Sequence, residues 1–355
     1  MSQEPVSVHP ALSRRAFLRL AAGSAAFTFV MPNSLIPREK LPANTSLVED
    51  KIYLKHETGE LAWENVRRLK ALHDGLKDAN LLDSLHPISP QKADTEWVAL
   101  VHQREYIETV KRDAESGAKV LSTGHTLLSK DSFDVALWAV GGVLSACDAV
   151  MDGKTPNAFC AVRPPGHHAT RDKGMGFCIF NNAGIAARYL QKKRRVGRVL
   201  IVDWDVHHGN GTQDIFYEDR SVFYFSTHQR PWYPFTGSEQ ETGEGEGRGT
   251  TLNAPLPAGS GDTELIEAFE KKLLPQALKF KPDFVLISAG FDSRTADPLG
   301  RFRVTDDGFK KLTRIMLHIA AECAEGRLVS ILEGGYSLKG LSTAAPAHIE
   351  ALIKG

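Results

Sequence analysis

The sequence is poor in cysteine and carries no net charge, and each shortage excludes a class of protein. Its 355 residues include four cysteines, with no Cys-x-x-Cys pair. This spacing predicts neither a disulfide scaffold nor a thiolate zinc site, so buried free thiols are expected. Lys plus Arg and Asp plus Glu each number 43, so the formal net charge is zero. Electrostatics therefore gives no reason to expect a nucleic acid or an anionic membrane as partner.

Familiar catalytic motifs of several enzyme classes are also missing. The chain has no Gly-x-Ser-x-Gly, no His-Glu-x-x-His, no phosphate-binding loop and no dinucleotide-binding fingerprint. It has no internal repeat. A hydrophobic fraction of 42% is ordinary for a globular protein, and a chain of this length can bury a sizeable core.

The N-terminal residues combine paired arginines with a mild apolar run. Arg14 and Arg15 lie in the segment Ser-Arg-Arg-Ala-Phe-Leu-Arg, and apolar residues follow from Leu20 to Met31. This arrangement resembles a twin-arginine export signal, and a basic amphipathic helix is the alternative. We expect a signal over residues 1–35, a linker over 36–47 and a folded domain over 48–355. The protein would then be periplasmic or extracellular, or membrane-anchored if the signal is not cleaved.

Helical and strand-like patterns alternate along the rest of the chain, without a second linker. Apolar residues recur with helical spacing in four segments, 96–114, 132–151, 263–280 and 306–324. Five shorter runs are strand-like, at 157–162, 198–202, 222–225, 284–288 and 328–332. Several of these runs are apolar throughout, which is typical of strands buried on both faces of a parallel sheet. The sequence therefore predicts a single α/β domain with a mostly parallel central sheet and helices on both faces.

Polar residues cluster directly after the predicted strands. Asp205 and His207 follow the apolar run Val199–Val202, and side chains two residues apart in extended backbone point the same way. One strand end can therefore offer a carboxylate and an imidazole to one metal ion. Glycine with ionisable or hydroxyl side chains also follows three other strands, at 163–168, 289–292 and 333–336. Ligands of open α/β sheets bind beyond such strand ends, so we expect these four segments to meet.

Five motifs make the chain resemble a known family. In order they are Arg-Pro-Pro-Gly-His-His-Ala (163–169), Gly-Phe-Cys-Ile-Phe-Asn-Asn (176–182), the run 203–211, Ser-Ala-Gly-Phe-Asp (288–292) and Glu-Gly-Gly-Tyr (333–336). They are similar to motifs of the histone deacetylase and acetylpolyamine amidohydrolase family, which is related to the arginases. The first motif resembles that of class II and bacterial members. The likeness runs from about residue 52 to near the C-terminus and implies an arginase/deacetylase-like fold.

The resemblance implies a metal site at Asp205, His207 and Asp292. Three protein ligands leave a place for water, as in catalytic rather than structural zinc sites. Zn²⁺ is the implied ion, and this oxygen-rich set would also accept Fe²⁺ or Co²⁺. A second metal, as in arginase, would lack ligands, because Val206 and His208 flank His207 and no extra aspartate is present.

The resemblance also implies residues for proton transfer and charge stabilisation. His168 matches the histidine that exchanges protons with water and the leaving amine, and His167 matches the one that tunes the charge beside it. Tyr336 matches the hydroxyl that donates to the developing oxyanion. Asp203 and Asn210 match the groups that orient the two histidine rings. Some relatives have Asp in place of Asn210, and a neutral partner makes the paired imidazole less basic.

A narrow tunnel for an acyl-lysine side chain is implied as well. Its matching residues are Phe177, Tyr233, Gly176, Gly334 and Gly335. Aromatic walls suit an extended methylene chain. The segment Pro-Trp-Tyr-Pro-Phe-Thr-Gly (231–237) departs from the family's Tyr-Pro-Gly-Thr-Gly, because Phe235 takes the place of a glycine. The rim of the tunnel is therefore expected to be narrower than usual.

A monovalent cation site, usually for K⁺, is the last site that the resemblance implies. It matches Asp203 and Ser226, together with the backbone carbonyls of Asp205, His207 and Thr227. The alternative for Ser226 is an ordinary hydroxyl at a strand end.

The combined matches imply a zinc-dependent amidohydrolase that removes acetyl or similar acyl groups from N-acylated amines by means of metal-activated water. Acetylated polyamines, acetylated amino compounds and acetyl-lysine peptides are all candidate substrates. The family's usual His-Pro-Glu is missing from residues 55–65, so the resemblance does not select among them. The alternative is a sensor protein that binds acylated amines with little turnover, and acetate release distinguishes the two. A homo-oligomer is left open.

Overall fold

The computed structural model describes residues 45–355, and the statements below concern that part of the chain. The predicted export signal and most of the predicted linker lie outside the described residues. Residues 45–47, which the sequence analysis assigned to the linker, instead form the beginning of strand β1 (Thr45–Val48). Strand β1 pairs with a neighbour on each side. The folded domain therefore begins at least three residues before the predicted boundary.

Eight strands form one sheet in which every neighbouring pair is parallel, so the predicted α/β fold with a parallel sheet is confirmed. Their order is β2-β1-β3-β8-β7-β4-β5-β6. The strands after β1 are β2 (Leu85–Ile88), β3 (Asn157–Cys160), β4 (Val199–Asp203), β5 (Val222–Gln229), β6 (Thr251–Leu256), β7 (Phe284–Ala289) and β8 (Leu328–Leu332).

Three strands were not predicted, namely β1, β2 and β6. Two of them, β2 and β6, form the edges of the sheet, and each contains a proline, Pro87 and Pro255 respectively. Proline cannot donate a hydrogen bond to a neighbouring strand, so it is tolerated at an edge but weakens the strand pattern in the sequence. The five predicted strands are all present, and β5 continues four residues beyond its predicted end.

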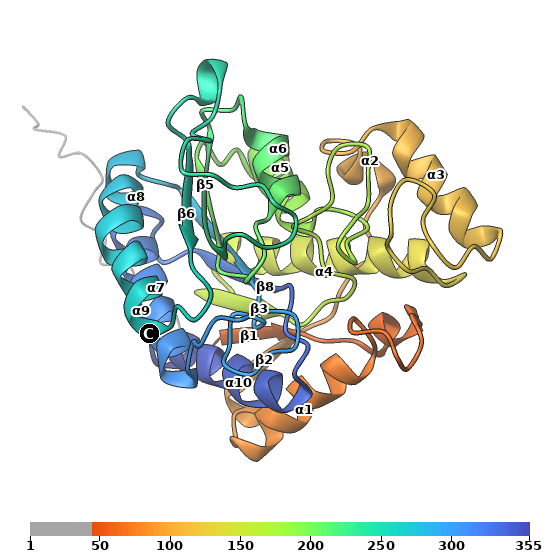
Figure 1. Ribbon diagram of the computed structural model, residues 1–355, viewed down its shortest axis with the longest axis horizontal. Helices are drawn as coiled ribbons and strands as arrows, with labels where there is room; N and C mark the ends of the chain where they lie inside the picture. The colour runs from red at the N-terminus through yellow and green to blue at the C-terminus, as the bar shows by residue number, and fades with distance from the viewer. Residues whose placement is uncertain (1–44) are drawn as a thin grey trace, which may run out of the picture. The chain divides into compact units, whose positions relative to one another are not determined.

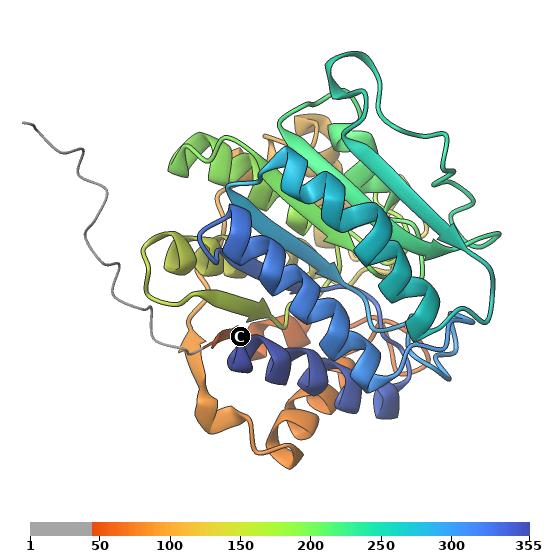
Figure 2. The same ribbon diagram turned by 90° about the vertical axis from the view of Figure 1, so that its left-hand side faces the viewer.

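Two groups of helices cover the two faces of the sheet (Figures 1 and 2). One face is covered by α9 (Asp306–Cys323) and α10 (Leu338–Lys354), which contact the strands directly and also pack against α1 (Arg67–Asp78), α7 (Asp262–Ala268) and α8 (Leu274–Phe280). The other face is covered by α4 (Ser132–Met151) and α5 (Asn182–Arg194), beside α2 (Thr95–Val98), α3 (Arg104–Glu115) and α6 (Asn210–Phe216).

Two predicted helices are interrupted. The expected helix over 96–114 divides into α2 and α3, because the N–H of Gln103 leaves the helical pattern and donates to the carbonyl of Arg171. The expected helix over 263–280 contains a wider π-turn, Phe269–Leu273, between α7 and α8. Pro275 lies in the first turn of α8 and has no N–H to donate, which explains why the regular hydrogen-bond pattern is broken there.

Helix α4 is the one helix among residues 45–355 that is long and apolar enough to cross a membrane. Within the domain, 78% of its 18-residue apolar window is buried, and it contacts β1, β3 and β8. Its composition is therefore that of a core helix.

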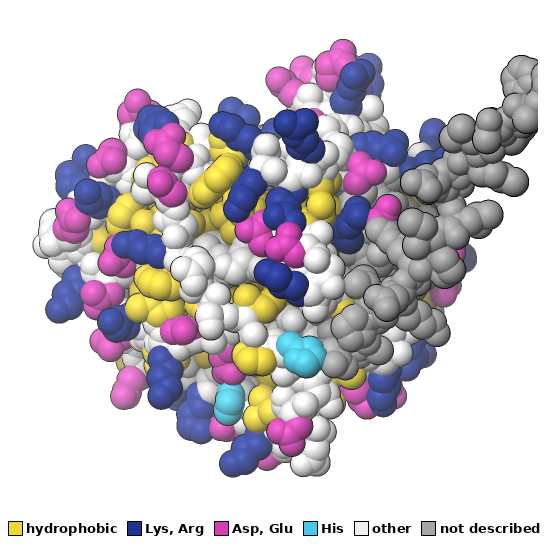
Figure 3. All heavy atoms as spheres, turned by 180° about the vertical axis from the view of Figure 1, so that it is seen from behind, with side chains coloured by type: hydrophobic (Ala, Val, Ile, Leu, Met, Phe, Trp, Pro, Cys, Tyr) yellow, Lys and Arg dark blue, Asp and Glu magenta, His cyan; other side chains and the backbone are white. Residues whose placement is uncertain are grey.

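Figure 3 shows one face of the molecule, on which acidic and basic side chains alternate between small apolar areas. This face therefore carries no continuous field of a single charge.

Candidate active site

The polar segments that follow four of the strands meet at one edge of the sheet. His167 and His168 follow β3, Asp205 follows β4, Asp292 follows β7 and Tyr336 follows β8. These strands lie in the order β3-β8-β7-β4 and are all parallel, so their carboxyl ends lie side by side. The sheet thus brings together residues that are up to about 170 positions apart in the chain.

Asp205, His207 and Asp292 form a compact buried cluster. The Nδ1 atom of His207 lies 2.9 Å from Oδ1 of Asp205 and 3.1 Å from Oδ2 of Asp292. One ligand atom from each residue lies within 4.8 Å of the other two. Backbone N–H groups hold both carboxylates, since Gly334 donates to Asp205 at 2.9 Å and Val206 donates to Asp292 at 2.9 Å.

Glycine allows the backbone to approach this cluster closely. A Cβ atom at Gly334 would lie 2.1 Å from Oδ2 of Asp292, and one at Gly290 would lie 2.1 Å from Oδ2 of Asp205. Both distances are shorter than any real contact, so a side chain at either position would displace a carboxylate.

The donor set fits a divalent cation. Burial, and next the charge of Asp205, raise the pKa of Asp292 to about 7. Burial opposes protonation of His207, but hydrogen bonds with the two carboxylates raise its pKa to about 10. Two buried carboxylates therefore share one imidazole, and this excess of negative charge needs a positive partner. One imidazole nitrogen and two carboxylate oxygens are the ligands of an open zinc site.

The two tandem histidines differ in their partners. Nδ1 of His167 lies 3.0 Å from Oδ2 of Asp203, whereas Nδ1 of His168 lies 2.8 Å from the amide oxygen of Asn210. The ring centroids of the two histidines are 4.0 Å apart. Burial opposes the charged form of both, but Asp203 and Asp205 raise the pKa of His167 to about 10.

For His168, burial and the neighbouring His167 and His207 all act in the same direction and hold the pKa well below its usual value. Since the amide oxygen of Asn210 can only accept, Nδ1 of His168 is the donor in that hydrogen bond. The lone pair of Nε2 is then free to take up a proton.

Tyr336 is held by two groups that the sequence analysis did not identify. The backbone N–H groups of Tyr336 and Ser337 donate to Oδ2 of Asp297 at 2.7 and 2.8 Å. Arg68 donates to the carbonyl oxygen of Gly335 at 2.7 Å and also to that of Glu333, and its guanidinium lies 5.0 Å from the centroid of the Tyr336 ring. These contacts fix the backbone on both sides of the tyrosine.

A buried ion-pair network supports Arg68 in turn. Glu64 accepts from Arg68 at 3.2 Å, and it pairs with Arg163 through two contacts, one of them 2.7 Å between Nη2 and Oε2. Burial alone would raise the pKa of Glu64, but the charge of Arg163 and its hydrogen bond lower it to about 2. Arg68 and Arg163 are 95 positions apart in the sequence, so no local pattern could have revealed this network.

The residues predicted to form the tunnel also lie around these groups. The ring centroid of Tyr233 lies 5.1 Å from that of His168 and 6.0 Å from that of His207, and the ring of Phe177 lies 5.6 Å from that of Tyr336. A Cβ atom at Gly176 would lie 2.2 Å from Cδ2 of His168. Gly176 therefore provides the space that the His168 ring occupies.

The residues predicted to bind a monovalent cation lie at the end of β4, directly after it, and in β5. Asp203 is paired with Ser226 in the register of these strands. The hydroxyl of Ser226 lies 2.9 Å from Nδ1 of His228, whose Nε2 lies 2.8 Å from the carbonyl oxygen of Gly237. The hydroxyl of Thr227 is buried and has no hydrogen-bond partner. Potassium binding there stays a prediction.

A second group with suitable ligand atoms, His167, Cys178 and Glu333, lies beside the first. The Glu333 carboxylate is already in use, because it accepts from the backbone N–H of Gly166 at 2.7 Å and from the hydroxyl of Ser288 at 3.1 Å. Burial raises the pKa of Glu333 to about 7. We interpret Glu333 as the anchor of the backbone that carries the tandem histidines.

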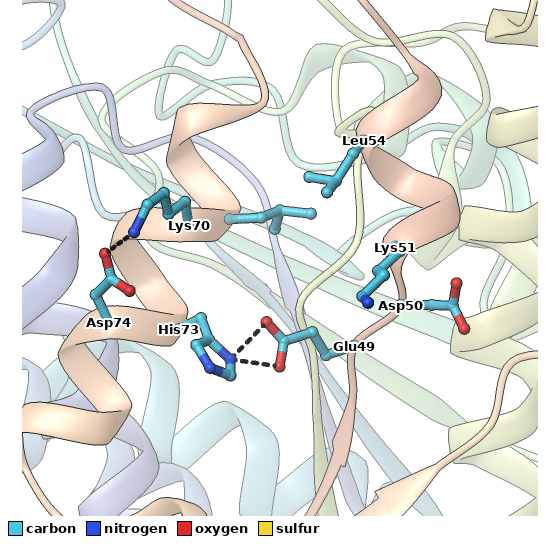
Figure 4. Close-up of a pocket in the computed structure, with 8 residues that line it drawn as sticks. Glu49, Asp50, Lys51, Leu54, Lys70, His73 and Asp74 are labelled. Carbon is cyan, nitrogen blue, oxygen red and sulfur yellow. Dashed lines mark hydrogen bonds and ion pairs between the residues drawn. The ribbon is translucent and has the colours of Figure 1, made fainter.

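A surface hollow of about 660 Å³ lies elsewhere, between the residues after β1 and helix α1. Figure 4 shows the imidazole of His73 facing the carboxylate of Glu49, at 3.1 Å, and Lys70 paired with Asp74, at 2.6 Å. Such partly exposed pairs are common and contribute little to stability. None of the residues predicted from the sequence to form a site lines this hollow.

The comparisons with known proteins agree with this geometry. The family model of the histone deacetylase domain matches residues 62–352. Histone deacetylase 10, chloroplastic, of Oryza sativa is 41% identical over 307 residues, which cover 82% of this chain and 69% of that protein. A probable deacetylase of Archaeoglobus fulgidus is 40% identical over 298 residues, which cover 83% and 82%.

Two further relatives extend the comparison. The polyamine deacetylase HDAC10 of Homo sapiens is 35% identical over 334 residues, which cover 91% of this chain and 48% of the human protein. The crystal structure of the HDA15 HD domain matches with a TM-score of 0.83 and 36% identity, covering 88% of this chain and 90% of that domain.

The fold and the site define a parallel α/β protein with a buried centre of carboxylates and histidines at the carboxyl edge of its sheet. Together with the family match, they establish that the chain belongs to the histone deacetylase family. The predicted family is thus confirmed. Its members are hydrolases that act on the amide bonds of acylated amines, and the family is generally metal-dependent.

Proposed function

We propose that this protein is a zinc-dependent amidohydrolase that removes acetyl or similar acyl groups from N-acylated amines. The observation that carries the proposal is the convergence of Asp205, His207 and Asp292 beside His168 and Tyr336, whose hydroxyl feels the charges of both carboxylates. A divalent ion held by the first three residues would polarise the amide carbonyl and make water a better nucleophile at neutral pH.

The protein's own groups would supply the remaining chemistry. His168, with Nδ1 held by Asn210, accepts a proton at Nε2 and returns it to the leaving amine. Asp203 orients His167 beside it and keeps positive charge next to the reacting atoms. The hydroxyl of Tyr336 donates to the oxygen that becomes negatively charged, while Arg68 and Asp297 hold its backbone in place.

Acetate release decides between this proposal and a sensor protein. Purified protein loaded with Zn²⁺ is incubated with an acetyl-lysine peptide and with an acetylated polyamine, and free acetate is measured. We expect turnover of at least one substrate and about one metal ion per chain. Saturable binding of both substrates without acetate would instead support the sensor. Parallel loading with Fe²⁺ and Co²⁺ identifies the ion that supports the highest turnover.

Two further predictions concern a monovalent cation and the export of the protein. We propose that K⁺ binds near Asp203, Ser226 and Thr227, which is supported by the unpartnered buried hydroxyl of Thr227; a melting temperature that is equal in KCl and in NaCl would contradict this. We also propose export by the twin-arginine route, on the sequence alone. Replacing Arg14 and Arg15 with lysines should retain the protein in the cytoplasm, and unchanged location would exclude the signal.

A further inference from the structure

Phe235 combines two features that do not favour folding. Its side chain is 74% exposed, so it contributes little to the core. Its backbone φ angle is +69°, in the left-handed region that residues with a Cβ atom rarely adopt. Glycine is the residue that adopts this conformation without strain. A strained backbone that carries an exposed ring is an outlier of the kind found at functional positions.

The loop that carries Phe235, residues 230–237, is anchored on both sides of the ring. The N–H of Phe235 donates to the carbonyl of Trp232 at 2.8 Å, and the indole N–H of Trp232 donates to the carbonyl of Leu299 at 2.8 Å. On the other side, the hydroxyl of Thr236 lies 2.8 Å from Nδ1 of His208. The phenyl ring is therefore presented from a fixed position.

This loop also reaches the reacting groups. Tyr233 is only partly buried, and its ring centroid lies 5.1 Å from that of His168. Phe235 follows two residues later and is exposed. The loop thus runs from the histidine that exchanges protons to the surface. A substrate whose amide lies beside His168 must extend outward past this loop.

The chemistry of the loop favours an apolar rather than a cationic neighbour. Residues 230–237 include one cation, Arg230, and three aromatic side chains. The two acids that follow are already engaged, because Glu239 accepts from Lys272 and Glu241 accepts from Gln213. The guanidinium of Arg301 lies 5.2 Å from the Trp232 ring. A free polyamine would bring further positive charge toward Arg301, whereas an apolar group would bury surface against Phe235.

We propose that Phe235 determines specificity by contacting an apolar group next to the acylated amine. The preferred substrates are then peptides in which an acyl-lysine is flanked by a large apolar residue, and free acylated polyamines are poor substrates. This proposal rests on the proposed function and names the substrate class of the same site.

Three substrates test the proposal: an acetyl-lysine peptide with leucine beside the lysine, the same peptide with glycine there, and acetylated spermidine. The variant Phe235→Gly removes the ring and suits the left-handed backbone, so its melting temperature should equal or exceed that of the wild type. We expect its kcat/KM for the leucine peptide to fall about five- to fiftyfold, mainly through KM. The kcat/KM of the variant for the other two substrates should differ from that of the wild type by less than about twofold.

Two matched variants sharpen this experiment. Phe235→Leu keeps the strained backbone and much of the apolar surface, so it should retain most of the preference for the leucine peptide. Leu278→Ala shortens an exposed apolar side chain on α8. It should leave kcat/KM for all three substrates unchanged.

In Phe235→Gly, an equal fall of kcat/KM for all three substrates would overturn the proposal, and so would a larger fall for acetylated spermidine than for the leucine peptide. If the wild type releases no acetate at all, the proposed function fails instead. The dissociation constants of the same peptides, measured by fluorescence anisotropy, would still decide the role of Phe235, because the ring is expected to act on binding.

Discussion

Buried histidines occur in two contrasting settings in this molecule. His348 lies in α10, and its ring nitrogens hydrogen-bond with the hydroxyls of Thr313 at 2.6 Å and Ser330 at 2.8 Å. Its ring packs against those of Phe159 and Trp204. Burial lowers its pKa to about 3, so it is neutral. His207, by contrast, lies between two carboxylates and its pKa is raised to about 10 despite burial.

The comparison shows that burial alone does not mark a functional histidine. A hydroxyl satisfies an imidazole without requiring charge, and the result is a structural contact. Buried carboxylates require positive charge and so create a place for a proton or a metal ion. Such carboxylates are stable at the strand ends because backbone N–H groups of Val206 and Gly334 donate to them. The predictions below test this contrast.

The largest effect is expected for Asp292→Asn, which removes one carboxylate from the cluster. Metal content should fall well below one ion per chain, and turnover should fall by about a thousandfold or more. The metal-free protein should melt at an equal or higher temperature, because one buried charge is gone. Elemental analysis, acetate release and thermal melting measure the three quantities. Asp283→Asn, outside the site, is the control. Loss of metal in that variant would mean that the loss in Asp292→Asn does not identify Asp292 as a ligand.

Tyr336→Phe should lower turnover by roughly 10² to 10³ while metal content stays near one ion per chain. The change removes only the hydroxyl that is proposed to stabilise the oxyanion. Steady-state acetate release and elemental analysis check this. Tyr189→Phe, which removes a hydroxyl bonded to Asp148 on α4, should keep full turnover. Unchanged activity in the Tyr336 variant would exclude the tyrosine from the mechanism.

Glu64→Gln should destabilise the protein by about 3–5 kcal/mol, because two buried arginines lose their counter-charge. The folded-state pKa of Glu64 is depressed to about 2. Its contribution to the free energy of unfolding is therefore complete above pH 4.5 and is lost as pH falls toward 2. Urea unfolding of wild type and variant across this range should converge at the acidic end.

The matched control for this ion pair is Glu49→Gln, which breaks the partly exposed pair with His73. It should change the free energy of unfolding by less than about 1 kcal/mol. An equal effect of the two glutamine variants would mean that the buried network contributes no more than a surface pair.

A smaller effect than that of Glu64→Gln is expected for His348→Leu, about 1–3 kcal/mol, since the hydroxyl of Ser330 loses its partner in the core. Turnover and metal content should not change. Because the folded-state pKa of His348 is depressed to about 3, the contribution of His348 to wild-type stability decreases as pH falls below 6.5. The variant should lose less stability over this range, as urea unfolding at pH 7 and pH 5 would show. Loss of metal in this variant would contradict the interpretation of His348 as a purely structural histidine, in contrast to His207.

Much of the architecture could be predicted from the sequence. The apolar runs that became β3, β4, β5, β7 and β8 are buried on both faces, and continuous apolar character is a local property. The edge strands β2 and β6 were missed because each contains a proline. A strand at the edge of a sheet tolerates proline, but the local sequence does not show that a segment will lie at an edge.

The sequence by itself determined the parallel α/β class, the family and the residue types at the strand ends, because periodicity and contiguous motifs are properties of neighbours along the chain. Only the tertiary structure decided which groups support those residues. Arg68 reaches the carbonyl of Gly335 across 267 positions, and Asp297 holds the backbone of Tyr336 from another loop. The sequence singles out Phe235 as a departure from the family motif, but only the structure shows that its ring is exposed and its backbone φ angle is positive. Such contacts depend on how strands pack together, and no local pattern encodes that packing.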